Sequence, residues 1–368
     1  MWRVKIYDNR RLLCANEEIE VYYKKGKLIV SIEKGKYEEK AIIIPCELML
    51  KLASRFRILE RIFRVEVKNA IIKDETIYFT FHGYVYKCIW KENRIQMVHQ
   101  FRKGMNNPIT LCNVTQISTF TDGVIYGEYW GNAAKERVNI YKEKGEEWEC
   151  VYTFPPNTIT HIHGFALDRE HGRILIMTGD TDEGSGIWET TDNFNTVKPL
   201  LVGKQQYRCC VAFPCKEGIL YATDTPLEKN YIYFLKENEC EKRLIRIQEL
   251  PGPCIYGRTY IDKKGKKQYV FATSVEPDSR IKGLRYLLTY RLGQGVQNRN
   301  VHIWMGNIED GFKEILHLKK DVFPMGLFQF GNVQFPDSPQ LIITGQAVKK
   351  FDAKTLILEE ETDEDPCD

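Results

Sequence analysis

Short apolar runs separated by polar turns extend along the whole chain, and one arrangement of these runs recurs. An apolar strand that starts with polar or aromatic residues is followed by a turn. A second apolar strand then ends on a carboxylate, an amide or a small polar residue. The two clearest copies cover residues 160–180 and 207–224. Weaker copies cover residues 110–128, 256–273 and 328–346.

The copies start roughly 45–50 residues apart, except for one long interval, and this spacing is typical of stacked units with four short strands each. Such units are the blades of a β-propeller. We therefore predict an all-β chain, with seven blades of four-stranded antiparallel sheet and six blades as the alternative. Propellers of this size are single domains, so residues 1–368 are predicted to form one domain. The last copy is short, so the N-terminal segment either completes it or forms its own blade.

Three segments depart from the repeat. Apolar residues over 46–64 fall near helical spacing among several arginines, which predicts one amphipathic helix. The interval 277–302 is rich in Arg, Gly, Gln and Asn, which predicts a loop insertion. The tail 359–368 is acidic and poor in apolar residues, and it is predicted to fray.

Composition narrows the class of protein. Of the 368 residues, 43% are hydrophobic, which is enough for a large core. The net charge is +3 with both signs well mixed, which argues against a nucleic-acid-binding surface. We find neither an apolar leader nor a stretch long enough to span a membrane, so we expect a cytoplasmic protein with no membrane partner. The 11 cysteines show no zinc-ligand spacing and are interpreted as buried thiols in a reducing compartment.

Polar residues gather at the strand ends of the repeat. Because consecutive strands of a blade run antiparallel, the start of the first strand and the end of the second lie at the same face. Concave faces with convergent polar groups are common binding sites. The residues predicted to share this face are His161, His163, Gln205, Arg208, Glu128, Asp180, Asp224 and Glu276.

His161 and His163 are two residues apart on a strand, so both rings leave one face. Three interpretations stay open. The rings hydrogen-bond a neighbouring blade, they contact substrate or act in acid–base catalysis, or they bind a divalent metal, since imidazole and carboxylate suit zinc or manganese. We predict no cofactor, with a divalent metal at this pair as the alternative.

The remaining polar residues suggest chemistry on a sugar. Arg208 can grip a carboxylate or sulfate through two hydrogen bonds, or it can form an ion pair with Asp180 or Asp224. Two carboxylates flanking a glycosidic bond can serve as acid and base or as nucleophile. The predicted catalytic residues are His163, Asp180, Arg208, Asp224 and Glu128. The predicted substrate-binding residues are His161, Gln205, Tyr207, Asn132, Asn230, Tyr129 and Glu276.

One turn of the chain resembles a known motif. Residues 190–196 resemble the Asp-box of sialidase-like propellers, with Phe194 where the motif has glycine. Less complete copies lie at residues 141–148 and 307–311. The box is a turn whose carboxylate caps backbone N–H groups, so it indicates the fold and not the catalysis.

A wider resemblance covers residues 50–350. The chain resembles bacterial BNR-repeat, sialidase-like proteins, many of them described as glycosyl hydrolases from the fold alone. The matching motifs are Gly127-Glu128-Tyr129 with Asn132 and Arg137, His161-Ile162-His163, Thr178-Gly179-Asp180, Gln205 with Tyr207-Arg208, and Thr223-Asp224 with Asn230. The resemblance implies a propeller that acts on glycans. The arginine triad and Tyr/Glu nucleophile pair of true sialidases have no match here, which argues against sialidase activity.

These features predict a glycan-active enzyme, a hydrolase or a lyase, whose partner is an acidic carbohydrate. A lyase would use His163 or Tyr207 as the base, and Arg208 would neutralise the uronate carboxylate. The alternative is a propeller that binds glycans or acts as a scaffold without catalysis. A metal-dependent enzyme at the two histidines is a third hypothesis.

Overall fold

A computed structural model of the chain describes residues 2–32, 38–237 and 242–360. Their strands form seven four-stranded sheets, the arrangement of a seven-bladed β-propeller. The prediction of an all-β fold with seven blades is confirmed, and the alternative of six blades is wrong. The chain divides into two compact units, which we call the middle unit (residues 65–249) and the terminal unit (residues 1–64 and 250–368). The single domain stays a prediction.

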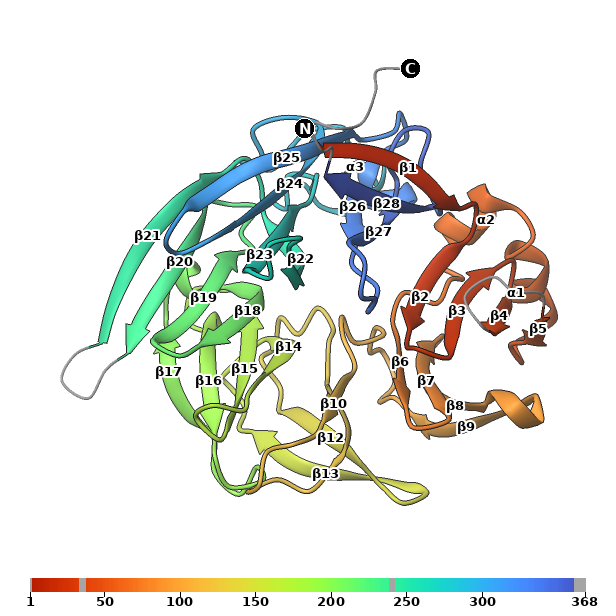
Figure 1. The fold of residues 1–368 in the computed structure, drawn as a ribbon, viewed down its shortest axis with the longest axis horizontal. Helices are drawn as coiled ribbons and strands as arrows, with labels where there is room; N and C mark the ends of the chain where they lie inside the picture. Colours follow the sequence, from red (N-terminus) through yellow and green to blue (C-terminus); the bar gives the residue numbers. More distant parts are fainter. Residues whose placement is uncertain (1, 33–37, 238–241, 361–368) are drawn as a thin grey trace. The chain divides into compact units, whose positions relative to one another are not determined.

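The middle unit contains four sheets whose strands follow sequence order, and Figure 1 shows them in succession from orange β6 to teal β21. The first two sheets comprise β6 (Ala70–Lys73), β7 (Thr76–Phe81), β8 (Tyr84–Ile89), β9 (Arg94–Gln100), β10 (Cys112–Val114), β11 (Gly123–Gly127), β12 (Val138–Lys144) and β13 (Glu147–Phe154). The other two comprise β14 (His161–Asp168), β15 (Arg173–Gly179), β16 (Gly186–Thr190), β17 (Lys198–Val202), β18 (Cys209–Cys215), β19 (Gly218–Thr223), β20 (Asn230–Glu237) and β21 (Lys242–Leu250). Two 3₁₀ turns are η1 (Trp90–Glu92) and η2 (Gln205–Tyr207).

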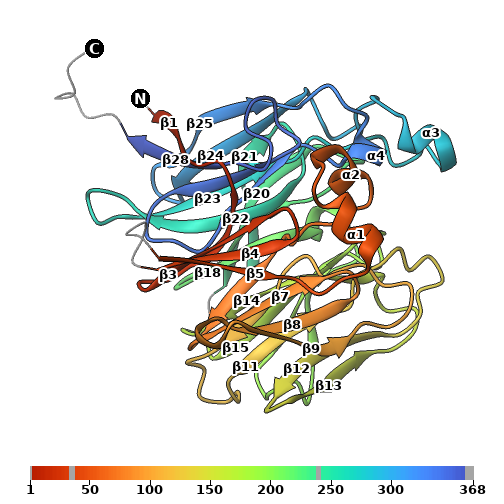
Figure 2. The same ribbon diagram turned by 90° about the vertical axis from the view of Figure 1, so that its right-hand side faces the viewer.

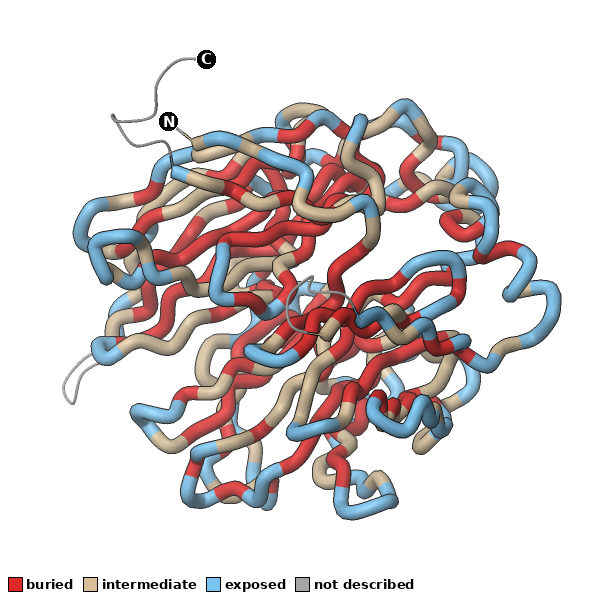
Figure 3. The backbone as a smooth tube through the Cα atoms, turned by 45° about the vertical axis from the view of Figure 1, so that its right-hand side comes forward, coloured by how far each residue is buried: buried red, intermediate tan, exposed pale blue. Residues whose placement is uncertain are grey.

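The second strand of each blade is apolar because it is covered on both sides. All residues of β15 are buried, and its side chains alternate between two cores. Ile174 and Ile176 pack with residues of β11 and β12. Leu175 and Met177 pack with residues of β18 and β19. Outer strands such as β13 are partly exposed, and Figure 3 shows this gradation from buried strands to exposed turns.

The terminal unit contains three sheets, with strand orders β2-β3-β4-β5, β22-β23-β24-β25 and β1-β28-β27-β26. Its strands are β1 (Trp2–Asp8), β2 (Arg11–Ala15), β3 (Ile19–Lys24), β4 (Lys27–Ile32), β5 (Glu38–Ile43), β22 (Cys254–Ile261), β23 (Lys267–Thr273), β24 (Asn300–Asn307), β25 (Gly311–Lys319), β26 (Asn332–Gln334), β27 (Ile342–Gln346) and β28 (Thr355–Glu360). Its short helices are α1 (Leu48–Ala53), α2 (Arg57–Ile62), α3 (Gly283–Leu287) and α4 (Met325–Phe328). Helix α4 contacts both α2 and α3 (Figure 2).

The N-terminal segment both completes the last blade and forms a blade of its own, the two alternatives that the short last repeat left open. Strand β1 pairs antiparallel with β28 and so completes the last sheet, while β2–β5 form a sheet of their own. Glu359 and Glu360 belong to β28, so the prediction of a frayed tail is wrong for these two residues. The rest of the predicted tail, 361–368, lies outside the described residues. The predicted loop 277–302 contains α3 and the start of β24.

The prediction of one helix over 46–64 is wrong, because two short helices stand there. Helix α1 ends at Ala53, with Ser54 as its C-cap, and the backbone at Phe56 is extended, with φ −116° and ψ 115°. The second helix is fixed by charge: Arg57 forms an ion pair with Asp352 at 2.8 Å, and Arg61 with Asp321 at 2.6 Å. Periodicity cannot register such a break when apolar residues continue on both sides of it.

The structure also bears on the expectations about membrane-spanning segments and about the cysteines. No helix in the described ranges is long and apolar enough to cross a lipid bilayer. The nine cysteines among the described residues are free thiols. Most are buried or half-buried, but Cys150 is exposed, so the interpretation as buried thiols is wrong at that position.

Candidate functional site

His161 and His163 lie at the start of β14, where the strand is irregular. The pairing of β14 with β15 shifts register between Ile162 and Gly164, so His163 is the extra residue of a β-bulge. An equivalent bulge places Cys210 in β18. Bulges turn a side chain out of the regular alternation and are frequent beside functional sites.

Backbone carbonyls fix the orientation of both imidazoles. Nδ1 of His161 is 2.7 Å from the carbonyl oxygen of Trp130, and Nδ1 of His163 is 3.0 Å from that of Cys209. A carbonyl can only accept a hydrogen bond, so each Nδ1 carries the proton. In the neutral rings both Nε2 atoms are therefore unprotonated, and they face each other at 3.1 Å.

Asp180 and Arg208 complete the centre of the site. The Asp180 Oδ1 atom is 3.4 Å from each histidine Nε2 and 2.7 Å from Nη2 of Arg208. Nη1 of Arg208 also donates to the Asp180 carbonyl at 3.2 Å. The Asp180 side chain is 44% exposed while both rings are buried, so the site opens to solvent at this carboxylate.

Charge and burial set the protonation states. Burial alone would disfavour the ionised form of Asp180, but Arg208 and His161 outweigh it and hold the pKa of this carboxyl well below its usual range. Burial lowers the pKa of His163, against a smaller opposing effect of Asp180. The neutral ring is thus the stable form of His163 near neutral pH.

Asp224 and Cys210 also lie close to His163, and Asp224 approaches Arg208. The Asp224 Oδ2 atom is 3.6 Å from Nη2 of Arg208 and accepts a hydrogen bond from the Cys210 thiol at 3.2 Å. Burial, reinforced by Asp224, raises the pKa of Cys210 well above its usual value. Cys210 is therefore a thiol. We call His161, His163, Asp180, Arg208 and Asp224 the histidine–arginine cluster.

Three predicted substrate contacts lie around this cluster. The ring of Tyr129 is 4.5 Å from that of His161, measured between centroids. Gln205 donates to the Asp180 carbonyl and to Asp182 Oδ1, both at 2.9 Å, so it holds the loop that carries Asp180. Tyr207 ends η2, immediately before Arg208, and is half-buried.

Glu128 is not part of the cluster. Its Oε2 atom accepts from the Asn139 N–H at 2.8 Å and from Arg102 at 3.0 Å, and the side chain is fully buried. Arg102 stacks on the indole of Trp130, 4.4 Å from the ring centroid. The Trp130 carbonyl orients His161. Glu128 is therefore linked to the cluster indirectly, through Arg102 and Trp130.

Asn132, Asn230 and Glu276 also have other surroundings. Asn132 and Asn230 are buried, and their amides hydrogen-bond the backbone of their own loops. Glu276 belongs to the terminal unit and accepts a hydrogen bond from Ser274 at 2.6 Å. We therefore leave these three residues out of the candidate site.

Sequence reasoning missed several contributors to the site. The carbonyls of Trp130 and Cys209 and the Cys210 thiol belong to residues without a distinctive pattern. Gly179 was visible within the Thr178-Gly179-Asp180 motif, and its lack of a side chain makes room for the His163 ring. A glycine directly before a predicted site aspartate was the signal in the sequence that could have indicated a close contact at this position.

Three groups of described residues have the composition of a metal site. The first is His161, His163 and Asp180. The second, His163 with Cys210 and Asp224, shares one histidine with it and contains a protonated thiol. The third lies in the terminal unit, where His302 and His317 both contact Glu314. There the second nitrogen of His302 is 2.9 Å from Asn298 Oδ1, so that ring is engaged on both sides.

The turn that resembles an Asp-box has the expected geometry. Asp192 accepts hydrogen bonds from the N–H and the hydroxyl of Thr196, at 2.9 and 2.7 Å. Phe194, which replaces the glycine of the motif, has a left-handed backbone with φ 68° and is buried against Phe120. In the hairpin 141–148 the corresponding carboxylate, Glu143, instead contacts Tyr78 and Lys73.

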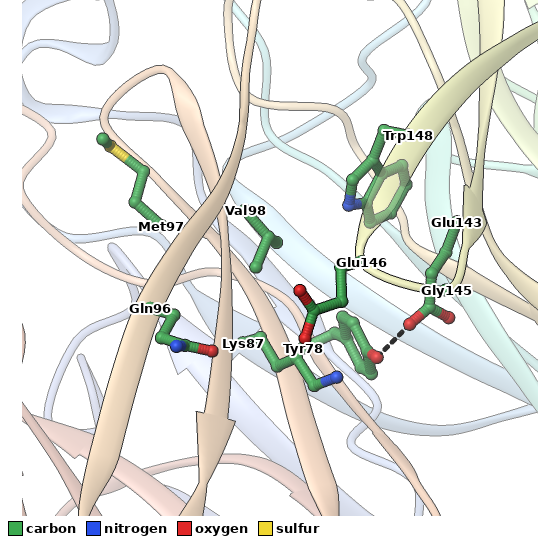
Figure 4. A pocket seen from close by; sticks show the side chains of 9 residues that line it. All are labelled: Tyr78, Lys87, Gln96, Met97, Val98, Glu143, Gly145, Glu146 and Trp148. Carbon is green, nitrogen blue, oxygen red and sulfur yellow. Dashed lines mark hydrogen bonds between the residues drawn. The ribbon is translucent and has the colours of Figure 1, made fainter.

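A pocket lies between the first two sheets of the middle unit (Figure 4). It is lined by Tyr78, Lys87, Gln96, Met97, Val98, Glu143, Gly145, Glu146 and Trp148. The Tyr78 hydroxyl donates to Glu143. This pocket contains an indole face beside carboxylates, an amide and an amine, and none of its residues belongs to the histidine–arginine cluster.

Comparison with known proteins supports the fold. No protein-family model matches the chain, and no curated protein matches its sequence, so the BNR-repeat resemblance is not confirmed. A chain of the mitotic checkpoint complex is similar in structure, with a TM-score of 0.55 and 10% identity over 98% of this chain and 94% of that one. The oligogalacturonate lyase of Vibrio parahaemolyticus has a TM-score of 0.54 and 9% identity, over 96% and 91%. The WD40 propeller domain of Doa1 has 0.53 and 9%, over 98% and 96%.

Identities this low show a shared propeller fold and leave the activity open. The three neighbours include an enzyme, a WD40 domain and a component of a protein assembly, so the fold is compatible with each. Function has to be argued from the cluster itself.

Proposed function

We propose that the protein is a glycan-active enzyme whose active site is the histidine–arginine cluster and whose substrate is an acidic oligosaccharide. The observation that carries the proposal is the meeting of the Nε2 atoms of two imidazoles with an aspartate and an arginine, at a point where Asp180 reaches solvent. Enzyme sites combine such groups because proton transfer and charge stabilisation are needed at the same atoms.

The geometry favours elimination over hydrolysis. Glycoside hydrolysis needs one carboxylic acid to protonate the leaving oxygen and a second carboxylate on the other side of the bond. Asp180 and Asp224 both approach Nη2 of Arg208, at 2.7 and 3.6 Å, and Arg208 keeps Asp180 ionised. Glu128, the third candidate, is bound to Arg102 and Asn139. Burial raises the pKa of Glu128, but its contacts with Arg102 and Asn139 hold its side chain outside the cluster, so it is not placed as an acid opposite Asp180.

Elimination needs fewer groups. A base removes the proton on the carbon next to the uronate carboxylate, and the electron pair left behind forms a C=C bond. The C–O bond to the neighbouring sugar breaks, and its oxygen takes up a proton. The protein must supply a cation for the uronate carboxylate and a base. Arg208 provides positive charge in the cluster, and the base is His163 or Tyr207, the two alternatives that the sequence left open.

The test is the formation of an unsaturated uronate, which absorbs in the ultraviolet. Acidic oligosaccharides of several linkages are incubated with the full chain and with the variant Arg208→Lys, which retains the charge but cannot make two parallel hydrogen bonds. We expect turnover to fall by about 100-fold, as for a displaced catalytic group. Arg169→Lys is the matched control, because Arg169 is exposed and its guanidinium hydrogen-bonds Thr115. Equal turnover in wild type and Arg208→Lys would refute the proposal.

A second candidate, glycan binding without turnover, is favoured by the pocket in Figure 4. An indole such as Trp148 can stack on a sugar face while Lys87, Gln96 and Glu146 reach hydroxyl groups. Retention on a glycan array with no product from any retained glycan would support this candidate and exclude the enzyme.

A further inference from the structure

Three potential metal-ligand atoms converge in the cluster. The Nε2 atoms of His161 and His163 are 3.1 Å apart, and each is 3.4 Å from Asp180 Oδ1. Both Nδ1–H groups are committed to backbone carbonyls, so neither ring can direct a proton inward without becoming charged. Lone pairs in this arrangement repel one another unless a cation lies between them.

The distances among the three atoms fit a metal ion. Ligands about 2.0–2.2 Å from one ion are separated by about 3.3–3.6 Å in tetrahedral geometry and by about 2.8–3.1 Å in octahedral geometry. The observed separations of 3.1, 3.4 and 3.4 Å lie in this range. We propose that His161, His163 and Asp180 bind one divalent first-row transition-metal ion, of which Zn²⁺ and Mn²⁺ are the first candidates.

The surroundings of the three ligands match those of metal sites. Histidine ligands commonly donate their second N–H to a carbonyl, which fixes the tautomer and aims the ring, and both rings do so here. Two nitrogens and one carboxylate oxygen suit a transition metal better than Ca²⁺ or Mg²⁺, which prefer oxygen ligands. Since Asp180 is partly exposed, the ion would keep open positions on the solvent side.

In its functional part the inference rests on the proposed function, because it concerns the same cluster. With neutral imidazoles the formal charge of the cluster is −1, from Asp180, Asp224 and Arg208 (−1 −1 +1). A divalent ion changes this charge to +1. An acidic sugar would then meet a positive site instead of a negative one, and the metal with Arg208 would hold its carboxylate. His163 becomes a ligand, which leaves Tyr207 as the base.

The first experiment measures metal binding by the full chain. The protein is freed of metal with a chelator and titrated calorimetrically with Zn²⁺ and with Mn²⁺, and Co²⁺ is added separately to follow its visible absorption bands. We expect one equivalent to bind. Asp180→Asn has the same shape and a partly exposed position, so it should fold, and we expect its affinity to fall by at least about 100-fold, more than for loss of an outer-shell group. His161→Gln should show the same loss.

His317→Gln is the matched control, because His317 is the exposed histidine of the group in the terminal unit. It should bind metal as the wild type does. Circular dichroism of each variant confirms that the fold is intact. Absence of stoichiometric binding, or binding that survives both Asp180→Asn and His161→Gln, would overturn the metal site.

The second experiment separates the metal from the proposed function. Metal bound at the cluster with no elimination of any acidic oligosaccharide would refute the function and leave the site standing. Elimination by the metal-free protein, at the same rate as by the metal-loaded protein, would refute a role of the metal in the reaction and leave the proposed function standing. Elimination that is lost with the metal and restored by its addition would support both.

Discussion

The imidazole of His163 lies on the backbone of Gly179, so closely that no other residue fits at position 179. A β-carbon there would come within 2.3 Å of Cε1 and 2.6 Å of Nε2 of His163. Distances below 3.0 Å require the neighbour to move, and the His163 ring is confined by its hydrogen bond to Cys209. The glycine therefore fixes where Nε2 of His163 points.

Gly179→Ala should displace the His163 ring and disturb the cluster. We expect a metal affinity about 10–100-fold lower, as for other groups that only orient a ligand, with a parallel loss of turnover. Calorimetric titration measures the first and ultraviolet absorbance the second. Gly131→Ala is the control, since a β-carbon at 131 would meet no atom within 4 Å. Unchanged affinity in Gly179→Ala would show that the contact does not position His163.

Phe194→Gly should destabilise the protein although it relieves backbone strain. The left-handed conformation at φ 68° costs a residue with a side chain about 1–2 kcal/mol. Loss of a buried phenylalanine costs about 3–5 kcal/mol. The net loss in the free energy of unfolding should therefore be about 1–4 kcal/mol, measured by urea denaturation. Asn157→Gly, at φ 67° in an exposed loop, should change stability little. Stabilisation by Phe194→Gly would mean that the strain dominates.

The ion pair of Asp352 should make stability depend on pH. Burial disfavours the charged form, but two hydrogen bonds from Arg57 at 2.8 Å, with Arg61 nearby, lower the pKa of Asp352 below its usual range. The carboxyl is more acidic in the folded state, so its contribution is complete above pH about 4 and is lost as the pH falls through the lower folded value.

Asp352→Asn should remove that contribution. We expect a loss of about 1–3 kcal/mol near neutral pH, the value of hydrogen bonds to a charged group, and a smaller difference from wild type at pH about 3. Thermal denaturation across this range tests the prediction. A difference from wild type that stays constant down to low pH would show that the ionised carboxylate is not the stabilising form.

Trp148→Ala should separate binding at the pocket of Figure 4 from chemistry at the cluster. Loss of the indole removes a stacking surface worth about 0.5–1.5 kcal/mol, so glycan retention should weaken about 2–10-fold. Trp148→Phe keeps an aromatic face and should retain most of the binding. Turnover should be unchanged in both variants, because Trp148 is not part of the cluster. Loss of turnover together with retention would place the substrate at this pocket.

Much of the architecture was predictable from local pattern. Runs such as Ile174–Met177 are apolar at every position because the strand is covered on both sides, and their recurrence gives the blades. The break at Phe56 was not predictable, because the helix that follows it is held by ion pairs of Arg57 with Asp352 and of Arg61 with Asp321, 295 and 260 residues away.

The sequence alone determined the repeat, the strand count of each blade and the positions of His161, His163, Asp180, Arg208 and Asp224 at strand ends, because hydrophobic alternation and turn residues act locally. Only the tertiary structure decided which of the polar residues meet. It excluded Glu128, Asn132 and Asn230 from the cluster, and it turned both Nε2 atoms toward Asp180. That choice depends on a bulge, a glycine and two backbone carbonyls from other strands, and hydrogen bonds between distant segments leave no periodic trace in a sequence.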